Sequence, residues 1–167
     1  PVDLDLVVEG DAVELALRLD PEATFHERFG TAECEVDGVK VDLATARTEK
    51  YPHPGSLPDV TPSSLGEDLS RRDFTINAMA VTLPDVGFVD LHGGVADLGA
   101  GLLRTPGRPE DSFDDDPLRM MRAARFASQL EMTVAPEAVA AMTAMADRLA
   151  IVSAERIRDE LSKLLLG

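Results

Sequence analysis

Two aspartates near the beginning of the chain have the residue type and spacing of a metal-ion site. Asp3 and Asp5 lie two residues apart in the apolar run VDLDLVV, residues 2–8. Because side chains alternate along a β-strand, both carboxylates would point to one face while Leu4 and Leu6 point to the other, into a core. Carboxylate oxygens suit Mg²⁺, so one interpretation is a divalent-metal site. The other interpretation, an acidic and solvated edge strand, stays open on these residues alone.

A third aspartate lies in a predicted hairpin over residues 31–45. Two alternating runs flank Asp37-Gly38, a strong signal for a tight turn with positive φ. In the second run Asp42 falls on the polar face, opposite the valines and the leucine. It is therefore either a solvent-exposed side chain or a third carboxylate that joins the first two from a neighbouring strand.

Composition limits the class of protein. The chain has 167 residues, enough for one full domain or two small ones, and a net charge of −15. Such a charge argues against non-specific binding of nucleic acid, which depends on Lys and Arg. The single cysteine, Cys34, excludes an internal disulfide framework, fits a reducing compartment and is expected to be a small buried residue. No run is long and apolar enough for a membrane span, and we expect a cytoplasmic protein.

Apolar periodicity predicts a mixture of strands and helices. The Pro- and Gly-containing stretch over residues 47–66 shows no such pattern and is predicted to be a loop. From residue 116 the patterning is helical throughout, so we place a domain boundary in the polar stretch 106–114. The predicted helices cover residues 10–20, 67–83, 95–98, 116–130, 137–149 and 153–166, and a further strand covers residues 86–91. For the helix over residues 67–83, a break around residues 73–75 is the alternative.

Four blocks, in order, resemble the bacterial-type (class II) tRNA nucleotidyltransferases and the related poly(A) polymerases. The most specific block is DLSRRDFTINAMA, residues 68–80. The strand around residues 3–8 resembles the Asp-x-Asp strand of that family, and residues 42–58 resemble the strand and loop that follow it. Residues 115–126, DDPLRMMRAARF, resemble its Glu-Asp-x-x-Arg segment, with Asp115 where Glu is usual. Residues 153–166 resemble the next helix of the family's neck.

The resemblance implies an α+β fold. A polymerase-beta-like nucleotidyltransferase head with a small mixed antiparallel sheet would occupy residues 1–105. An all-helical neck, which recognises the base and begins the RNA-binding region, would occupy residues 106–167. The family's Gly-Gly-x-Val-Arg-Asp turn, which cradles the triphosphate, precedes the Asp-x-Asp strand and is not in this sequence. We therefore expect the chain to be a fragment, with the turn supplied by the full-length protein.

The resemblance also assigns roles to the three aspartates. Asp3, Asp5 and Asp42 would be the catalytic carboxylates, and Asp3 and Asp5 would hold Mg²⁺ in a two-metal mechanism. Arg72 and Asn77 would reach the phosphates and sugar of the incoming nucleotide. Asp73 would contact the sugar or order the turn, and the alternative is a purely structural role as a helix cap.

A second group of predicted nucleotide-binding residues lies in the helical part. Asp116 and Arg119, three residues apart, are expected on one helix face, where a carboxylate acceptor beside a guanidinium donor would read the base of ATP or CTP. The alternative is a simple intrahelical ion pair. Arg122 and Arg125 would extend the cationic stripe to the triphosphate or the RNA backbone. Alternatively, Arg125 is a solvated neighbour of Asp147 or Glu131.

Three functions follow from the resemblance. The first is template-independent transfer of CMP and/or AMP from CTP or ATP to the 3′ end of tRNA. The second is poly(A) polymerase activity on other RNA 3′ ends. The third is a non-catalytic fragment that binds nucleotide or RNA. The expected partners are therefore ATP, CTP and tRNA or another RNA 3′ end.

Overall fold

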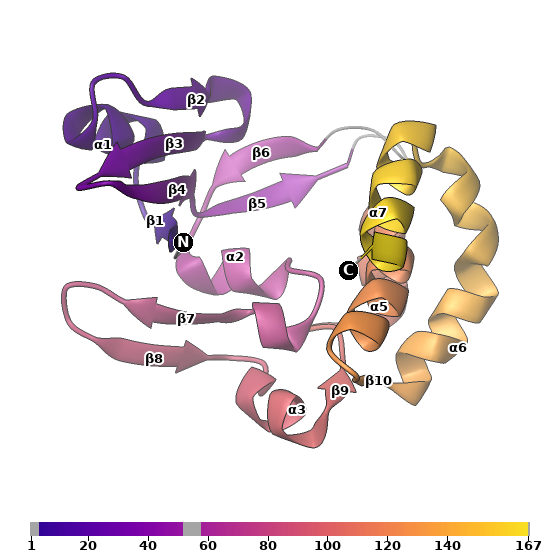
Figure 1. Ribbon diagram of the computed structural model, residues 1–167. Coiled ribbons are helices and arrows are strands. Elements are labelled where there is room, and N and C mark those ends of the chain that lie inside the picture. The colour runs from indigo at the N-terminus through magenta and orange to yellow at the C-terminus, as the bar shows by residue number, and fades with distance from the viewer. Residues whose placement is uncertain (1–3, 52–57, 167) are drawn as a thin grey trace. The chain divides into compact units, whose positions relative to one another are not determined.

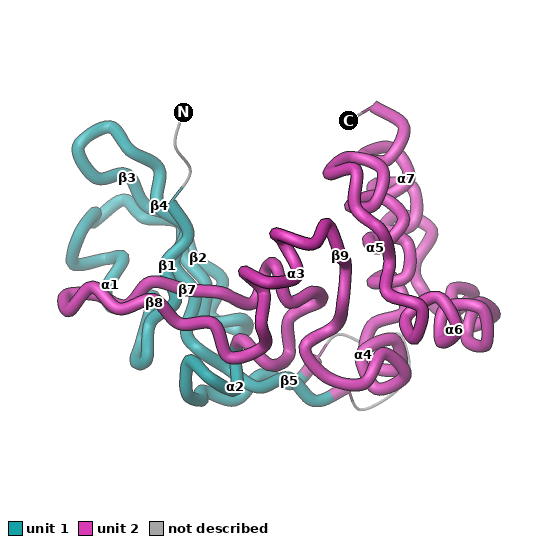
Figure 2. Tube along the Cα trace, turned by 90° about the horizontal axis from the view of Figure 1, so that it is seen from below, with its two compact units in different colours: residues 1–50, 59–68 teal, residues 51–58, 69–167 magenta. Residues whose placement is uncertain are grey.

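The computed structural model describes residues 4–51 and 58–166 (Figure 1). The chain forms two compact units, shown in different colours in Figure 2. The first unit comprises residues 1–50 and 59–68, and the second comprises residues 51–58 and 69–167. Both helices and strands are present, which confirms the α+β class.

The first unit is built on a four-stranded sheet with the order β1-β4-β3-β2. β1 runs parallel to β4, and the other two pairs are antiparallel, so the sheet is mixed as expected. Helix α1 packs against β3 and β4, and strands β5 and β6 form a separate hairpin. In chain order the elements are β1 (Leu4–Val8), α1 (Ala12–Leu19), β2 (Thr24–His26), the 3₁₀ turn η1 (Glu27–Phe29), β3 (Thr31–Val36), β4 (Val39–Thr45), β5 (Arg47–Lys50), β6 (Asp59–Pro62) and α2 (Leu65–Ser70), whose last two residues belong to the second unit.

The predicted hairpin over residues 31–45 is confirmed as β3 and β4. Asp37 and Gly38 take φ values of 52° and 78°, the positive φ that such a turn requires. Under the sheet, the core contains Cys34, as expected, and burial raises the pKa of its thiol. The expectation for Leu4 was wrong. It lies at the start of β1 and is 43% exposed.

The loop predicted over residues 47–66 was wrong. β5 and β6 pair over four residues each, from Arg47 opposite Pro62 to Lys50 opposite Asp59. Sequence periodicity missed them because β5 is polar throughout, and its strand conformation depends on the ladder with a segment about a dozen residues away. The Ser64 and Glu67 side chains also bond to backbone N–H groups at the start of α2, the capping-box arrangement.

The second unit holds a short hairpin and most of the helices. Strand β7 pairs with β8 antiparallel, α5 packs on α7, and α4 packs on α6. In chain order its elements are the 3₁₀ turn η2 (Thr75–Asn77), β7 (Met79–Thr82), β8 (Gly87–Asp90), α3 (Gly94–Ala100), β9 (Leu102–Leu103), α4 (Pro109–Asp115), α5 (Leu118–Gln129), β10 (Thr133–Val134), α6 (Pro136–Met145), the 3₁₀ segment η3 (Ala146–Ile151) and α7 (Ala154–Leu166).

One expectation for the second unit was wrong, and four helices are confirmed. The helix predicted over residues 67–83 ends at Ser70, and the chain then passes through a turn into β7, where pairing with β8 overrides helical periodicity. The polar stretch 106–114 contains most of α4, whose N-terminus is marked by Pro109 and the acidic residues after it. The helices predicted from residues 95, 116, 137 and 153 correspond to α3, α5, α6 and α7. Among the described residues, no helix combines the length and apolarity that crossing a membrane requires.

Replacement of Phe74 by alanine is expected to lower the free energy of unfolding by about 3–5 kcal/mol. The Phe74 side chain has no exposed surface and forms a T-shaped pair with Phe126, with ring centroids 5.8 Å apart. Urea unfolding of the variant measures the loss. Phe88→Ala is the matched control, because Phe88 is 60% exposed, and equal losses for the two variants would contradict the packing.

Candidate active site

The sheet of the first unit brings two of the three predicted catalytic carboxylates together. β1 and β4 are parallel neighbours, and Asp5 lies directly opposite Asp42 in their register. Both aspartates are exposed, whereas Val41 and Leu43 on either side of Asp42 are buried. The alternation of β4 therefore places its aspartate on the open face of the sheet, beside that of β1. Asp3, the third expected carboxylate, lies outside the described residues.

These two carboxylates suit a divalent cation. Neither Asp5 nor Asp42 makes a hydrogen bond or ion pair with another described side chain, so their oxygens remain available as ligands. Glu33 lies opposite Asp42 on β3, but it pairs with Lys40 at 3.3 Å. Within residues 4–51 and 58–166 no three side chains of the metal-binding types come together, so a complete ligand set would include Asp3 or groups outside this range.

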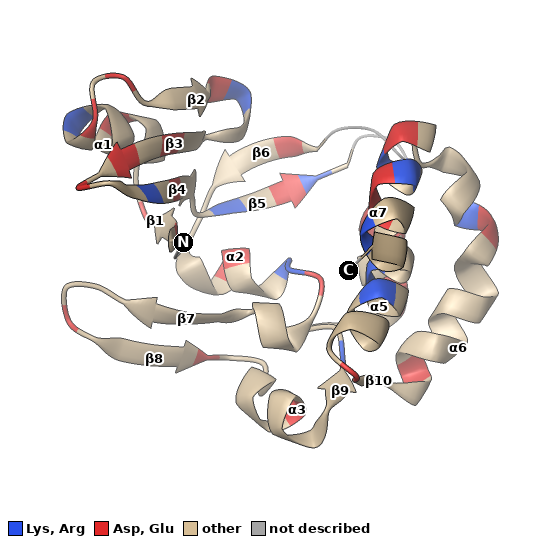
Figure 3. Cartoon of the chain, viewed as in Figure 1, with Lys and Arg blue, Asp and Glu red and all other residues tan. Residues whose placement is uncertain are grey.

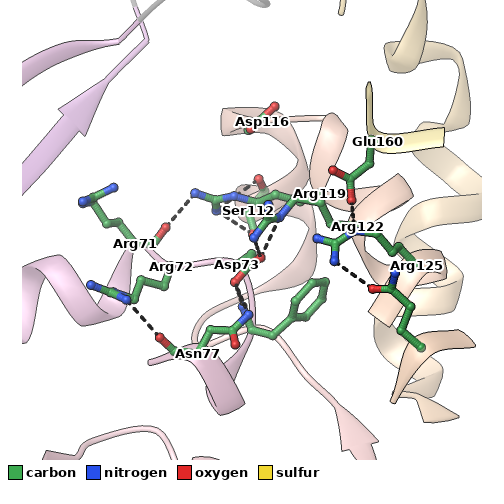
Figure 4. Close-up of polar contacts among 12 residues, drawn as sticks. Arg71, Arg72, Asp73, Asn77, Ser112, Asp116, Arg119, Arg122, Arg125 and Glu160 are labelled. Carbon is green, nitrogen blue, oxygen red and sulfur yellow. Dashed lines mark hydrogen bonds and ion pairs between the residues drawn. The ribbon is translucent and has the colours of Figure 1, made fainter. Parts of the chain in front are cut away.

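Residues 71–77 of the second unit form a turn organised around one carboxylate, and we call it the Asp73 turn. One Asp73 oxygen accepts hydrogen bonds from the Phe74 N–H at 2.8 Å and from the Asn77 side-chain amide at 3.0 Å. The other oxygen accepts from the Arg122 guanidinium, at 2.7 Å from Nε and 2.5 Å from the terminal nitrogen. Figure 4 shows these contacts converging on Asp73. The carboxylate therefore orders the turn and joins Asn77 to Arg122, but it does not cap η2, whose N-cap position is Phe74.

Arg72 is held at the same turn. Its guanidinium donates to the Asn77 carbonyl at 3.3 Å (Figure 4). The structure thus brings Arg72, Asp73, Asn77 and Arg122 of the predicted nucleotide-binding set into one cluster. A cluster of guanidinium and amide donors can bind phosphate oxygens and sugar hydroxyls.

Asp116 and Arg119 do not share a helix face, and the expectation that they do was wrong. Asp116 is the residue after α4, with φ −141° and ψ 98°, and α5 begins at Leu118. Pro117 explains the break, because the residue before a proline is driven out of the helical region. The Asp116 carboxylate instead accepts from the Leu118 N–H at 3.1 Å and from Arg156 of α7 at 2.7 Å.

The Arg119 side chain is buried, with only 9% of the residue exposed. Its guanidinium donates to the Ser112 hydroxyl at 2.8 Å and to the Arg71 carbonyl at 2.6 Å (Figure 4). Arg119 therefore links α4 to the start of the Asp73 turn. It does not form the simple ion pair with Asp116 that was the alternative. Two of its five N–H donors are not used by these contacts or by the longer one to the Ser112 carbonyl.

Arg125 is tied to α7 rather than to a solvated acid. Its Nε lies 2.5 Å from a carboxylate oxygen of Glu160, and its terminal nitrogen donates to Gln129 at 3.0 Å. The guanidinium lies over the Phe126 ring, 4.1 Å from the centroid. The charged positions of α5 are basic, as the blue segments in Figure 3 show, and Glu160 of α7 supplies the acid that pairs with Arg125.

Glu160→Gln is expected to lower the free energy of unfolding by about 3 kcal/mol, because it removes one partner of a buried ion pair. The Arg125 and Glu160 side chains are 12% and 5% exposed. Denaturant titration of the variant checks the loss. Asp159→Asn is the neighbouring control. It breaks an exposed pair with Arg158, for which about 0–1 kcal/mol is expected, and a similar loss in both variants would contradict burial as the cause.

Sequence reasoning missed the residues that hold the predicted site residues in place. Arg156 and Glu160 are four residues apart on α7, the spacing of one helix face, and this was the available signal. Ser112 lies in the polar stretch 106–114, where the sequence predicts a domain boundary rather than a functional group. Glu33 was not predicted either, although the alternation of polar and apolar residues in β3 places it on the same face of the sheet as Asp42.

Comparison with known proteins identifies the family. The family profile described as "Poly A polymerase head domain" matches residues 1–104, and that described as "Probable RNA and SrmB- binding site of polymerase A" matches residues 131–167. The chain is 47% identical over 135 residues to an A-adding tRNA nucleotidyltransferase of Aquifex aeolicus, a match that covers 77% of this chain and 16% of the relative. It is 41% identical over 174 residues to the A-adding tRNA nucleotidyltransferase of Halalkalibacterium halodurans, covering 97% of this chain and 40% of the relative.

A solved structure agrees with these matches. The crystal structure of the Bacillus stearothermophilus CCA-adding enzyme in complex with CTP superposes with a TM-score of 0.86 at 32% identity. The match covers 99% of this chain and 40% of that one. The chain thus spans less than half the length of the relatives it matches here. The resemblance found in the sequence is confirmed, and the chain belongs to the family of tRNA nucleotidyltransferases and poly(A) polymerases.

Proposed function

We propose that this protein transfers CMP and/or AMP from CTP or ATP to the 3′ end of tRNA without a nucleic-acid template. The observation that carries the proposal is the pairing of Asp5 with Asp42 on adjacent parallel strands, on the open face of the sheet. It occurs in a chain whose relatives are named A-adding and CCA-adding enzymes. The proposed site of action is the cytoplasm. The proposed domains are a head over residues 1–105 and a helical neck over residues 106–167.

In the proposed reaction the RNA 3′-hydroxyl oxygen attacks the α-phosphate of the nucleoside triphosphate, and pyrophosphate leaves. Asp5 and Asp42, with Asp3, are the proposed ligands of Mg²⁺. When bound there, Mg²⁺ would neutralise charge that develops on the attacking and leaving oxygens. Asp42 is also the proposed acceptor of the proton from the 3′-hydroxyl. Both described carboxylates are without other side-chain partners among the described residues, so they can take these roles without first breaking a contact.

The second unit is the proposed nucleotide-binding part. Arg72, Asn77 and Arg122 would bind the phosphates and sugar, and Asp73 would hold them in position. Asp116 and Arg119 would read the base through the carboxylate and the unused guanidinium N–H groups. Arg125, which is packed against Glu160, is proposed to place its positive charge near the triphosphate or the RNA backbone.

The test is incorporation of labelled CTP and ATP into a tRNA that lacks its last bases, with and without Mg²⁺. Metal-dependent addition of one to three nucleotides supports the proposal, and the length of the product separates CCA from A-only addition. Long A tails on RNA other than tRNA would support the second candidate, a poly(A) polymerase, which the match to the poly(A) polymerase head domain favours. ATP binding that is unchanged by EDTA and is followed by no turnover would contradict both.

A further inference from the structure

Thr75 is the most deeply buried polar residue of the Asp73 turn and has no role in the proposed reaction. It is 1% exposed and lies in η2, two residues from both Asp73 and Asn77. Its backbone N–H donates to the Arg104 carbonyl at 2.8 Å, and its carbonyl accepts from the Ala78 N–H at 3.0 Å. Both backbone polar groups of Thr75 are therefore hydrogen-bonded, which fixes the backbone of the turn at this residue.

The side chain of Thr75 is held by a carboxylate from another element. Its hydroxyl donates to Asp97 of α3 at 2.7 Å, in a contact that is buried. The second oxygen of Asp97 lies 3.3 Å from the Arg104 guanidinium, so its charge is paired. Asp97 is 7% exposed. A charged acceptor makes a stronger hydrogen bond than a neutral one, and more so away from water.

The close approach of α3 to the turn depends on a glycine. A side chain at Gly94, the first residue of α3, would place its Cβ 2.3 Å from the Thr75 carbonyl oxygen and 2.8 Å from Met79. The Asp90 carboxylate accepts hydrogen bonds from the Val95 N–H at 3.0 Å and the Gly94 N–H at 2.7 Å, and these hydrogen bonds lower the pKa of Asp90. α3 is thus anchored at its start with its Gly94 and Asp97 face against the turn.

We propose that Asp97 is a positioning residue for nucleotide binding, which acts by holding Thr75 and, through Thr75, the Asp73 turn. This inference rests on the proposed function, since it assumes that the turn binds the incoming nucleotide. Loss of the hydrogen bond frees the Thr75 rotamer and loosens the backbone between Asp73 and Asn77. The side chains of those residues then spend less time in the geometry that binds nucleotide.

The experiment uses three variants and one control. Thr75→Val removes the hydroxyl and keeps the branched shape, Thr75→Ser keeps the hydroxyl, and Asp97→Asn keeps an acceptor oxygen without the charge. Thr143→Val is the control, because Thr143 is exposed and its hydroxyl donates, within the part of the chain that the structure describes, to the Val139 carbonyl of its own helix α6. For each variant the KM for ATP and CTP, the KM for tRNA, kcat and the melting temperature are measured.

Thr75→Val is expected to raise the KM for nucleotide about tenfold while kcat and the KM for tRNA change less than about twofold. Thr75→Ser is expected to restore most of the affinity, Asp97→Asn to fall between the two, and the control to match the parent. A Thr75→Val protein that is folded and keeps the parent KM for nucleotide would overturn the inference. A lower melting temperature with an unchanged KM would do the same, since it marks a role in stability alone.

Failure of the proposed function is detected separately. If the parent protein incorporates no nucleotide, ATP binding is measured directly by titration calorimetry on the parent and on Thr75→Val. Weaker ATP binding by the variant supports the positioning role even without turnover. Equal binding by the two proteins contradicts it.

Discussion

Asp5→Asn is expected to lower the rate of nucleotide incorporation by about a thousandfold, with the fold intact. The substitution keeps the size of the side chain and removes its negative charge, so a metal ligand is lost without a cavity being created. Asp5 is exposed and makes no hydrogen bond or ion pair with another described side chain, so its replacement disturbs no visible packing. Single-turnover incorporation of CTP or ATP, with circular dichroism to verify folding, measures the effect.

The control for this prediction is Glu35→Gln. Glu35 lies two residues beyond Glu33 on β3 and is exposed on the sheet, so its loss changes the charge by the same amount at a different place. It is expected to keep the parent rate. If both variants lose the same activity, the effect is one of net charge, and if Asp5→Asn stays fully active, the two-carboxylate site is contradicted.

Asp116→Ala is expected to reduce the preference for CTP and ATP over UTP and GTP by about tenfold to a hundredfold. Asp116 is the acid of the pair that is proposed to read the base, and its carboxylate accepts from the Leu118 N–H and from Arg156 rather than from Arg119. Without the carboxylate, a base edge meets guanidinium donors alone, so bases that differ in their hydrogen-bonding groups are distinguished less well. Competition between nucleotides at equal concentration measures the preference.

Asp114→Ala is the comparison variant for base choice. Asp114 precedes Asp116 by two residues, is exposed and pairs with Arg148 at 2.7 Å. It is expected to keep the parent preference. An unchanged preference in Asp116→Ala would contradict base reading, whereas a change of the same size in both variants would point to the shape of the α4–α5 connection.

The alternating and capping patterns of the sequence determined much of the local structure. The positive φ of Asp37 and Gly38, the exposed face of Asp42 and the start of α7 after Ser153 all depend on near neighbours along the chain. Residue type and spacing report such features because backbone preference and period are local properties. The break at Pro117 was also predictable from local sequence, because a proline disfavours helical conformation in the residue before it. The three-residue spacing of Asp116 and Arg119 led instead to the prediction of a continuous helix.

Contacts between distant residues were decided only by the tertiary structure. The 2.5 Å pair of Arg125 and Glu160 joins residues 35 apart, and the hydrogen bond of Thr75 to Asp97 joins residues 22 apart. The polar strand β5 exists because β6 pairs with it. From the sequence, each of these residues has many potential partners, and burial of one specific pair depends on how the helices and strands pack. The sequence thus determined which side chains are available for chemistry, and the packing decided which neighbours hold them.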